Sequence, residues 1–276
     1  MLPDSPQSTD LRQAALHWLV ENDAVQKAAG VRRLAQAWAA GEFGLDAGAA
    51  LSATPTIPGH PARPALVSPL EVKRRAMNTP EGRAAMIHAL VHIEFNAINL
   101  ALDALWRFAD MPRAYYADWL KVADEEALHF TLLANHLKTQ GYAYGDFSAH
   151  NGLWDMAVKT QHDVLARMAL LPRTMEARGL DVTPGTRAKL VQAGDSEIGP
   201  ILDIVMRDEI GHVAIGNHWF NYMCEQRGLE PEAAYASMLV EYNAVPRRGP
   251  FNLEARRAAG FSEQELAGLG LNLSSK

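Results

Sequence analysis

The sequence predicts an all-α protein built around four long helices. Through most of the chain, apolar residues recur at three- and four-residue spacing, the period of a helix with one buried face. No run of residues shows the apolar–polar alternation of a half-buried strand. Two stretches, 126-EALH-129 and 209-EIGH-212, repeat one Glu-x-x-His spacing inside predicted helices. Together these observations favour a helical bundle with polar groups in its interior.

The segment before the bundle is predicted to be a helix followed by an extended strap. Apolar spacing indicates a first helix over 9–41, ending near Gly41 and Gly44. Residues 54–69 contain five prolines, which exclude a continuous helix and favour a strap over the surface, with a mobile linker as the alternative. Ser68 to Glu71 has the pattern of a capping box, and Thr79-Pro80 that of a helix start.

Four long helices follow, over 80–109, 112–140, 152–179 and 195–227. The breaks between them are expected at 110–112, 141–152 and 179–185, where glycine and proline gather. Pro172 and Pro200 predict kinks. A shorter helix over 230–243 and a polar tail, with a second capping box from Ser262 to Glu265, complete the chain.

Candidate site residues lie on all four long helices, so the chain is predicted to be a single domain over 1–276. The N-terminal helix and strap take 1–78, the four-helix metal-binding bundle 79–228, and a C-terminal extension 229–276.

Composition indicates an ordinary cytoplasmic globular protein. The chain is 48% apolar and 21% charged, and it has no run of 18 apolar residues that could span a bilayer. We therefore expect no membrane partner. The N-terminus lacks the pattern of a secretory signal, and a single cysteine, Cys224, fits a reducing compartment. A net charge of −6 argues against a general nucleic-acid coat.

Each of the four long helices places a glutamate in its apolar stripe. These residues are Glu94, Glu126, Glu176 and Glu209. Burying an ionised carboxylate without a partner is costly, and four converging carboxylates also repel one another. No lysine or arginine lies on the stripes near them, so ion pairing within the stripes does not offset their charge. Two divalent cations would neutralise four carboxylates.

The spacing of the histidines supports the same interpretation. Residues three apart share one helix face, so Glu126 with His129, and Glu209 with His212, can each offer an oxygen and a nitrogen to one centre. One Glu from each of two helices and a Glu-x-x-His from each of two others is the di-iron or di-manganese carboxylate arrangement. Glu94 and Glu126 are 32 residues apart, and Glu176 and Glu209 are 33, so two helical hairpins repeat one ligand order.

This ligand set resembles that of the ferritin-like superfamily of non-haem di-iron carboxylate proteins. Three stretches, 92-HIEFNAINLALD-103, 176-EARGLD-181 and 208-DEIGHVAIGNHWF-220, are similar to an uncharacterised bacterial ferritin-like family labelled domain of unknown function 455. The resemblance covers most of residues 70–230, and the first helix and strap go with that family too. It implies a ferritin-like four-helix bundle with a dinuclear site and no particular substrate.

Three further residues are candidates for supporting the ligands. Metal-bound histidines commonly donate their other N–H to a carboxylate or carbonyl. By resemblance to superfamily members with an Asp-Glu-x-x-His run, Asp208 is a candidate partner for His129. Glu125 holds the corresponding place in the first motif. His92 points away from Glu94 and is expected to have a structural or supporting role.

The favoured function is an oxidase or monooxygenase that activates dioxygen at two iron ions, with manganese or a mixed manganese–iron pair left open. Its small-molecule substrate and its general acid and base are unknown. Iron storage with ferroxidase activity is one alternative. The long segments flanking the bundle argue against it, because they exceed what the subunit of a storage cage needs. A two-metal hydrolase is another alternative, but the sequence has no obvious set of phosphate-binding residues near the ligands.

The remaining partners are less constrained by the sequence. An electron-donor protein and a homodimer stay open, and so does a tRNA substrate, because the superfamily has a tRNA-hydroxylating branch. The basic pairs at 74–75, 247–248 and 256–257 are where such a substrate would bind, and ordinary solvated charge is the competing interpretation. The strap over 54–69 is a candidate cover for the metal site, hypothesised from its position and prolines.

Overall fold

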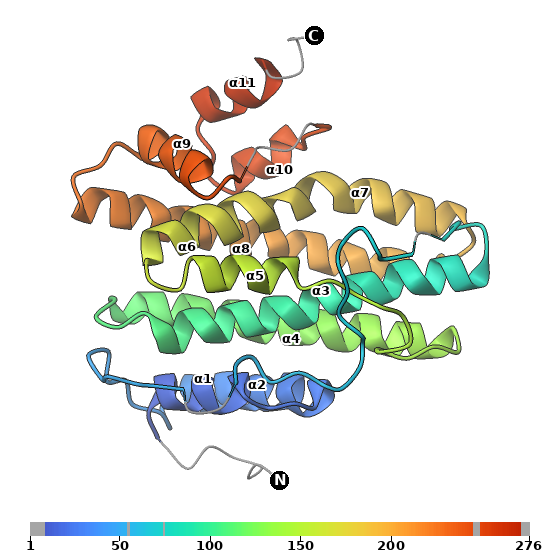
Figure 1. Ribbon diagram of the computed structural model, residues 1–276, viewed down its shortest axis with the longest axis horizontal. Helices are drawn as coiled ribbons and strands as arrows, with labels where there is room; N and C mark the ends of the chain where they lie inside the picture. The colour runs from blue at the N-terminus through green and yellow to red at the C-terminus, as the bar shows by residue number, and fades with distance from the viewer. Residues whose placement is uncertain (1–8, 54–55, 74, 245–248, 272–276) are drawn as a thin grey trace. The chain divides into compact units, whose positions relative to one another are not determined.

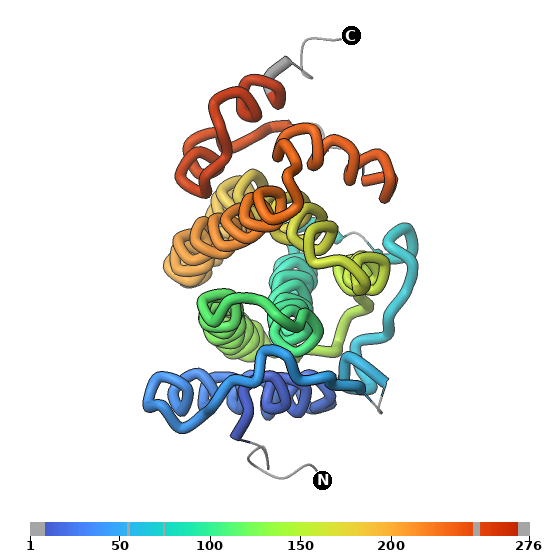
Figure 2. The backbone as a smooth tube through the Cα atoms, turned by 90° about the vertical axis from the view of Figure 1, so that its left-hand side faces the viewer, coloured from blue at the N-terminus to red at the C-terminus, as the bar shows by residue number. Residues whose placement is uncertain are grey.

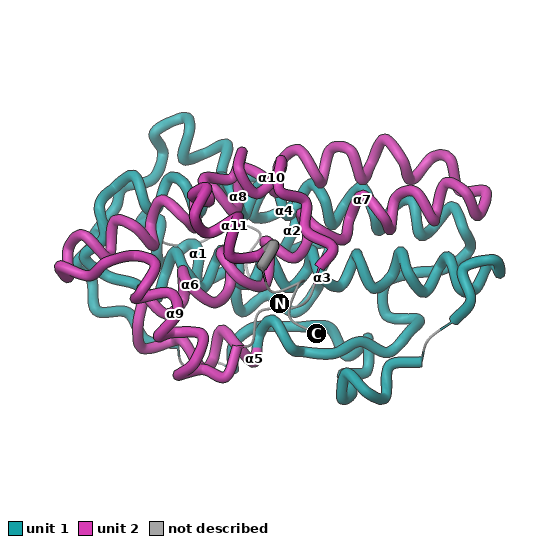
Figure 3. The backbone as a smooth tube through the Cα atoms, turned by 90° about the horizontal axis from the view of Figure 1, so that it is seen from above, with its two compact units in different colours: residues 1–154 teal, residues 155–276 magenta. Residues whose placement is uncertain are grey.

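The computed structural model describes residues 9–53, 56–73, 75–244 and 249–271, and it divides into two compact units. Unit 1 is Met1–Trp154 and unit 2 is Asp155–Lys276 (Figure 3). The described residues confirm the all-α class, since they form helices and no named strand. Two isolated bridges, Asp10 with Gly44 and Leu66 with Ala149, are the β-type pairings among them. Each unit is described by itself below.

Unit 1 is built on a long helical hairpin. Helix α3 (Pro80–Arg107) and helix α4 (Arg113–Thr139) lie side by side, and helices α1 (Leu11–Leu19) and α2 (Ala24–Ala39) lie along the pair, α1 against α3 and α2 against α4 (Figures 1 and 2). Among the described helices, α3 is the one that resembles a membrane span by length and apolar composition, but 72% of its most apolar window is buried inside the protein. That burial is typical of a core helix in a soluble protein.

The prediction of a single first helix over 9–41 is wrong. The segment forms two helices, α1 and α2, which are separated by residues 20–23. The Asp23 carboxylate caps α2 by accepting hydrogen bonds from the backbone N–H groups of Val25 and Gln26, both at 2.9 Å. A side chain that satisfies the orphan donors of a new helix start stabilises this break.

The proline-rich strap, whose first two positions lie outside the described residues, is held to unit 1 at two places. The Gly59 N–H donates to the carbonyl of Leu19 at 2.8 Å, and a Cβ at Gly59 would lie 2.2 Å from the carbonyl oxygen of Val20. Further along, Ala149 N–H donates to Ala65 at 3.0 Å and Val67 N–H donates to Ala149 at 2.8 Å. These bonds favour an anchored strap over a mobile linker.

The predicted capping residues form the expected hydrogen bonds. Thr79 accepts from the Gly82 N–H at 3.0 Å, directly before Pro80 opens α3. Ser262 N–H donates to the Glu265 carboxylate at 2.8 Å, at the start of α11 (Glu263–Leu271). The Ser68 N–H also donates to Glu71 at 3.0 Å, but there the box closes a turn and no helix begins.

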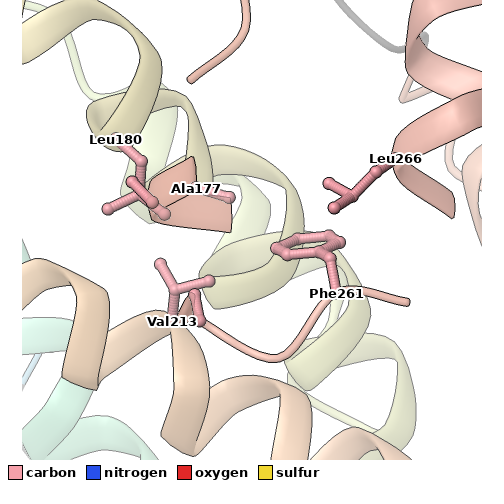
Figure 4. Packing of buried hydrophobic residues seen from close by; sticks show 7 residues of the cluster. Ala177, Leu180, Val213, Phe261 and Leu266 are labelled. Carbon is pink, nitrogen blue, oxygen red and sulfur yellow. The ribbon is translucent and has the colours of Figure 1, made fainter. Parts of the chain in front are cut away.

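Unit 2 holds the second long hairpin and the C-terminal helices. Helix α6 (Val164–Leu170) runs through a π-helical segment, η1 (Leu171–Glu176), into α7 (Ala177–Gln192), and these pack against α8 (Ile198–Gln226). Helices α9 (Pro231–Glu241), α10 (Leu253–Ala258) and α11 follow. Figure 4 shows Phe261 and Leu266 of the C-terminal part facing Ala177 and Leu180 of α7 and Val213 of α8, in one buried cluster.

The third predicted helix, 152–179, differs most from the structure. Its first part is a separate helix, α5 (Gly152–Lys159). The next helix, α6, begins after Asp163, whose carboxylate caps it by accepting a hydrogen bond from the Leu165 N–H at 2.9 Å. Pro172 sits in the π-helical segment, where the turn is wider than in an α-helix, and Pro200 falls in the first turn of α8, where no intrahelical donor is needed.

The break predicted at 179–185 is also wrong, because α7 continues to Gln192 with Pro184 inside it. Proline has no N–H for the carbonyl four residues earlier, that of Leu180. The side-chain amide of Asn252 donates to this carbonyl at 3.3 Å instead. The other long helices and α9 match their predicted ranges within a few residues. That the two hairpins form one four-helix bundle, and that 1–276 is one domain, stay predictions.

Candidate metal centre

Unit 1 gathers three of the predicted ligands between α3 and α4. Glu94 comes from α3, and Glu126 and His129 lie one turn apart on α4. Their side chains are almost wholly buried, with 3%, 1% and 0% of each residue exposed, respectively. The burial follows from the apolar residues one turn away on the same helices, such as Val91, Ile98 and Phe130, which are buried as well. The sequence therefore places two carboxylates and an imidazole in a core.

The three side chains lie close enough to share one cation. The Nδ1 atom of His129 is 3.5 Å from a carboxylate oxygen of Glu94 and 3.4 Å from one of Glu126. One ligand atom from each of the three residues lies within 4.8 Å of the others. A metal ion bound at the usual distance of about 2 Å from each atom fits among donors at that spacing.

The electrostatics of this cluster call for a positive charge. Burial and the neighbouring Glu126 carboxylate raise the pKa of Glu94 to about 8, against the opposing effect of His129. Burial by itself lowers the pKa of His129, but Glu126 and Glu94 outweigh it and raise that pKa to about 12. Two carboxylates that are costly to ionise together hold a proton on the imidazole beside them, so the site favours a positive charge, which a metal ion would supply in place of that proton.

Unit 2 carries the other three predicted ligands. Glu209 and His212 lie one turn apart on α8, with the His212 Nδ1 atom 3.9 Å from a Glu209 carboxylate oxygen. His212 is fully buried and Glu209 is half-buried. Glu176 is the last residue of η1, is half-buried, and belongs to a segment that packs against α8. The second Glu-x-x-His thus has the same local form as the first.

The three predicted supporting residues have contacts of their own. His92 lies within hydrogen-bond distance of the Tyr144 hydroxyl, at 2.9 Å, and of the His150 carbonyl, at 3.0 Å. Glu125 pairs with Lys121 at 2.5 Å and Asp208 with Arg207 at 2.8 Å. The contact expected between Asp208 and His129 stays a prediction.

The basic pairs have different surroundings from one another. Residue 74 and the pair 247–248 lie outside the described residues. Arg75 pairs with Glu81 at 2.8 Å. Arg256 is buried and pairs with Asp181 at 2.7 Å, while Arg257 pairs with Glu263 at 2.5 Å. Arg256 therefore has a structural role within unit 2, a role that its place in a basic dipeptide did not reveal.

Comparisons with known proteins place the chain among relatives without an assigned activity. The family model described as protein of unknown function (DUF455) matches residues 20–267. The chain is 50% identical over 217 residues, 76% of its length, to an "Uncharacterized protein" of Haemophilus influenzae, of which the match covers 75%. No solved structure matches the chain. The resemblance to domain of unknown function 455 is confirmed, and the link to the ferritin-like superfamily stays a prediction.

Proposed function

The chain belongs to the family described as protein of unknown function (DUF455), and from its buried carboxylate–histidine cluster we propose that it is a dinuclear non-haem metal protein that activates dioxygen. The reaction class is that of an oxidase or monooxygenase with a small-molecule substrate. Iron is the metal that this chemistry favours, and manganese or a mixed pair suits the same ligands.

The observation that carries the proposal is the burial of Glu94 and Glu126 against His129 in unit 1. Carboxylate oxygens with one imidazole nitrogen are the donor set of iron and manganese sites in helical bundles. Buried carboxylates are rare unless they are paired or bind a metal, because ionising them away from water is costly. The same Glu-x-x-His pattern on α8, with His212 buried, supports a second set of ligands of the same kind.

In the proposed site each hairpin contributes three ligands. Glu94, Glu126 and His129 come from the first, and Glu176, Glu209 and His212 from the second. Four carboxylates balance the charge of two divalent ions, and two neutral imidazoles complete the set. Buried apolar residues one turn from the ligands, among them Val122 and Phe130, keep water from the first set and hold its side chains in place.

The chemistry that two bound iron(II) ions supply is the transfer of electrons to dioxygen, coupled to oxidation of a substrate. The role of the protein is to bind the metal ions and to orient their ligands. His129 presents its Nδ1 atom to both carboxylates. Glu94 of α3 and Glu126 of α4 would hold the metal from two separate helices.

Metal content tests the proposal directly. Untagged protein purified without chelators should contain about two iron or manganese ions per chain by inductively coupled plasma mass spectrometry. Glu126→Gln keeps the shape of the side chain but removes its charge, and it should lower metal affinity by at least about 100-fold. Glu225→Gln, an exposed position on α8, is the matched control and should keep the metal.

Two outcomes contradict the proposal: no bound metal even after anaerobic iron loading, or equal metal content in Glu126→Gln and Glu225→Gln. Where metal is bound, products separate the function classes. Oxygen consumption tied to an organic product supports the oxidase or monooxygenase. Mineralised iron without an organic product indicates iron storage. If the metal-loaded protein consumes no oxygen, the two-metal hydrolase is the remaining alternative.

A further inference from the structure

Unit 1 contains a pocket of about 150 Å³ between the strap and α3. Prolines of the strap line one side, and Phe95, Asn96 and Asn99 of α3 line the other, with Trp154 beside them. None of the six predicted metal ligands belongs to this lining. The pocket lies on a different face of α3 from Glu94. Positions 95 and 99 are one turn apart and share a face, and position 94 does not belong to that face. It is therefore a separate site.

The walls of this pocket are held in place by hydrogen bonds. The strap is tied at Gly59 to the end of α1 and at residues 65–67 to Ala149. His92, a lining residue, lies within hydrogen-bond distance of the Tyr144 hydroxyl and of the His150 carbonyl. A cavity bounded by such fixed elements keeps its shape when a ligand enters, so little ordering entropy is lost on binding.

Asn99, beside the pocket, has a buried hydrogen-bond donor without a described acceptor. This residue is fully buried and lines the pocket. Its Oδ1 atom accepts a 2.5 Å hydrogen bond from the Nζ atom of Lys27. Because the oxygen must face the lysine, the orientation of the amide is determined and Nδ2 is the atom left over. Within the described residues Nδ2 is buried and has no hydrogen-bond acceptor. Buried donors of this kind normally have a partner.

The buried amine of Lys27, which is positively charged when protonated, lies directly behind Asn99. Lys27 has no exposed surface, and its other hydrogen bonds go to the carbonyl oxygens of Leu19, at 3.2 Å, and Gly59, at 2.7 Å. Its Nζ atom is also 4.8 Å from the centre of the Phe95 ring, a second wall of the pocket. All of these contacts are to neutral groups. An anion in the pocket would complement the ammonium group through Asn99.

We propose that this pocket binds a small monocarboxylate, with a carboxylate oxygen accepting a hydrogen bond from Asn99 Nδ2. The apolar body of the ligand packs between Phe95, Trp154 and the strap prolines. A cavity of about 150 Å³ admits a molecule of roughly the size of benzene, so the ligand is a short branched or single-ring acid. The site does not depend on the proposed metal centre.

Ligand binding to the full chain, stripped of metal by a chelator, tests this proposal. Acetate, 2-methylpropanoate and benzoate are titrated by isothermal calorimetry and by ligand-observed NMR, each beside its amide. Saturable binding of at least one carboxylate is expected, with an affinity at least about tenfold above that of the matched amide, because the amide carries no charge. Absence of binding by all three acids, or equal affinity for acid and amide, overturns the proposal.

Two variants locate the binding. Asn99→Asp retains an oxygen for Lys27 but replaces the donor by a second carboxylate, and it should weaken carboxylate binding at least about tenfold. Asn243→Asp, an exposed change in unit 2 with the same effect on net charge, should leave binding unaltered. Unchanged binding in Asn99→Asp overturns the proposal. If that variant does not fold, the comparison of acid with amide on the unaltered chain still decides.

Discussion

At the scale of single residues, the protein buries charge in two contrasting ways. The carboxylates of Glu94 and Glu126 lie against His129 and raise its pKa to about 12, so that the imidazole tends to carry the positive charge. Lys27 has neutral oxygens as hydrogen-bond partners, and burial lowers its pKa to about 7, against the opposing charge of Glu21. The first environment favours a cation, and the second favours loss of a proton.

Lys27 therefore predicts a rise of stability with pH. Its pKa is about 7 in the folded chain and 10.5 in the unfolded chain, so between these values the unfolded chain binds more protons. The free energy of unfolding should increase by about 4 kcal/mol across that window, and the cost of burying the ammonium is full below pH 7. Urea unfolding from pH 7 to about 10 measures it.

Lys27→Met provides the comparison for this measurement. Methionine keeps most of the buried volume but has no titrating group, so the variant should lack the rise assigned to Lys27 while other titrations remain. Parallel pH profiles for the two proteins would show that Lys27 does not change protonation on folding.

At the scale of elements, the contact between η1 and α8 decides where the ligands of unit 2 stand. A Cβ atom added at Gly216 of α8 would lie 2.3 Å from the Cβ atom of Pro172 in η1. The proline ring cannot rotate away, so the two elements must separate. Gly216→Ala should destabilise the protein by about 1–3 kcal/mol and reduce metal content, because η1 ends at Glu176 and α8 carries Glu209 and His212.

Gly185→Ala in α7 is the matched control for this prediction. Position 185 is exposed, and an added Cβ meets no described atom within 4 Å. Alanine should stabilise the helix there by about 0.5–1 kcal/mol. Thermal unfolding by circular dichroism and metal analysis compare the two variants, and a Gly216→Ala protein as stable and as metal-rich as Gly185→Ala would refute the packing argument.

At the scale of the whole molecule, the proposed ligand set divides equally between the two units. Glu94, Glu126 and His129 belong to unit 1, and the other three ligands belong to unit 2. A metal pair that uses all six ligands would therefore link the unfolding of the units. Differential scanning calorimetry should show one transition for the metal-loaded protein and a lower melting temperature after chelation, with about 2.7 kcal/mol lost if metal is present at 100 times its dissociation constant.

Glu209→Gln extends this prediction across the units. The substitution lies in unit 2, and it should also remove the metal-dependent stabilisation of unit 1. Hydrogen exchange of the α3 and α4 amides reports on unit 1 separately. If chelation leaves the melting temperature unchanged, or if Glu209→Gln affects the exchange of unit 2 alone, the two ligand sets act independently or bind no metal.

Much of the fold was predictable where local signals suffice. The period of apolar residues placed α3, α4, α8 and α9 within a few residues of their observed bounds. Capping residues such as Thr79 and Ser262 act through hydrogen bonds to N–H groups only three residues away. The inward direction of Glu94, Glu126 and His129 followed from the same period, because a residue in the apolar stripe of a helix shares the burial of its neighbours.

The sequence by itself thus determined the helical class, the family, three of the four long helices and the buried carboxylate–histidine motif. Tertiary structure alone decided features whose partners lie far along the chain. Helix α7 continues past Pro184 because Asn252, 72 residues after Leu180, supplies the missing donor. Lys27 is buried because the strap and α3 bring Gly59 and Asn99 to it. Periodicity reports which face of a helix is buried, but a polar group can be buried there only when distant segments satisfy its hydrogen bonds.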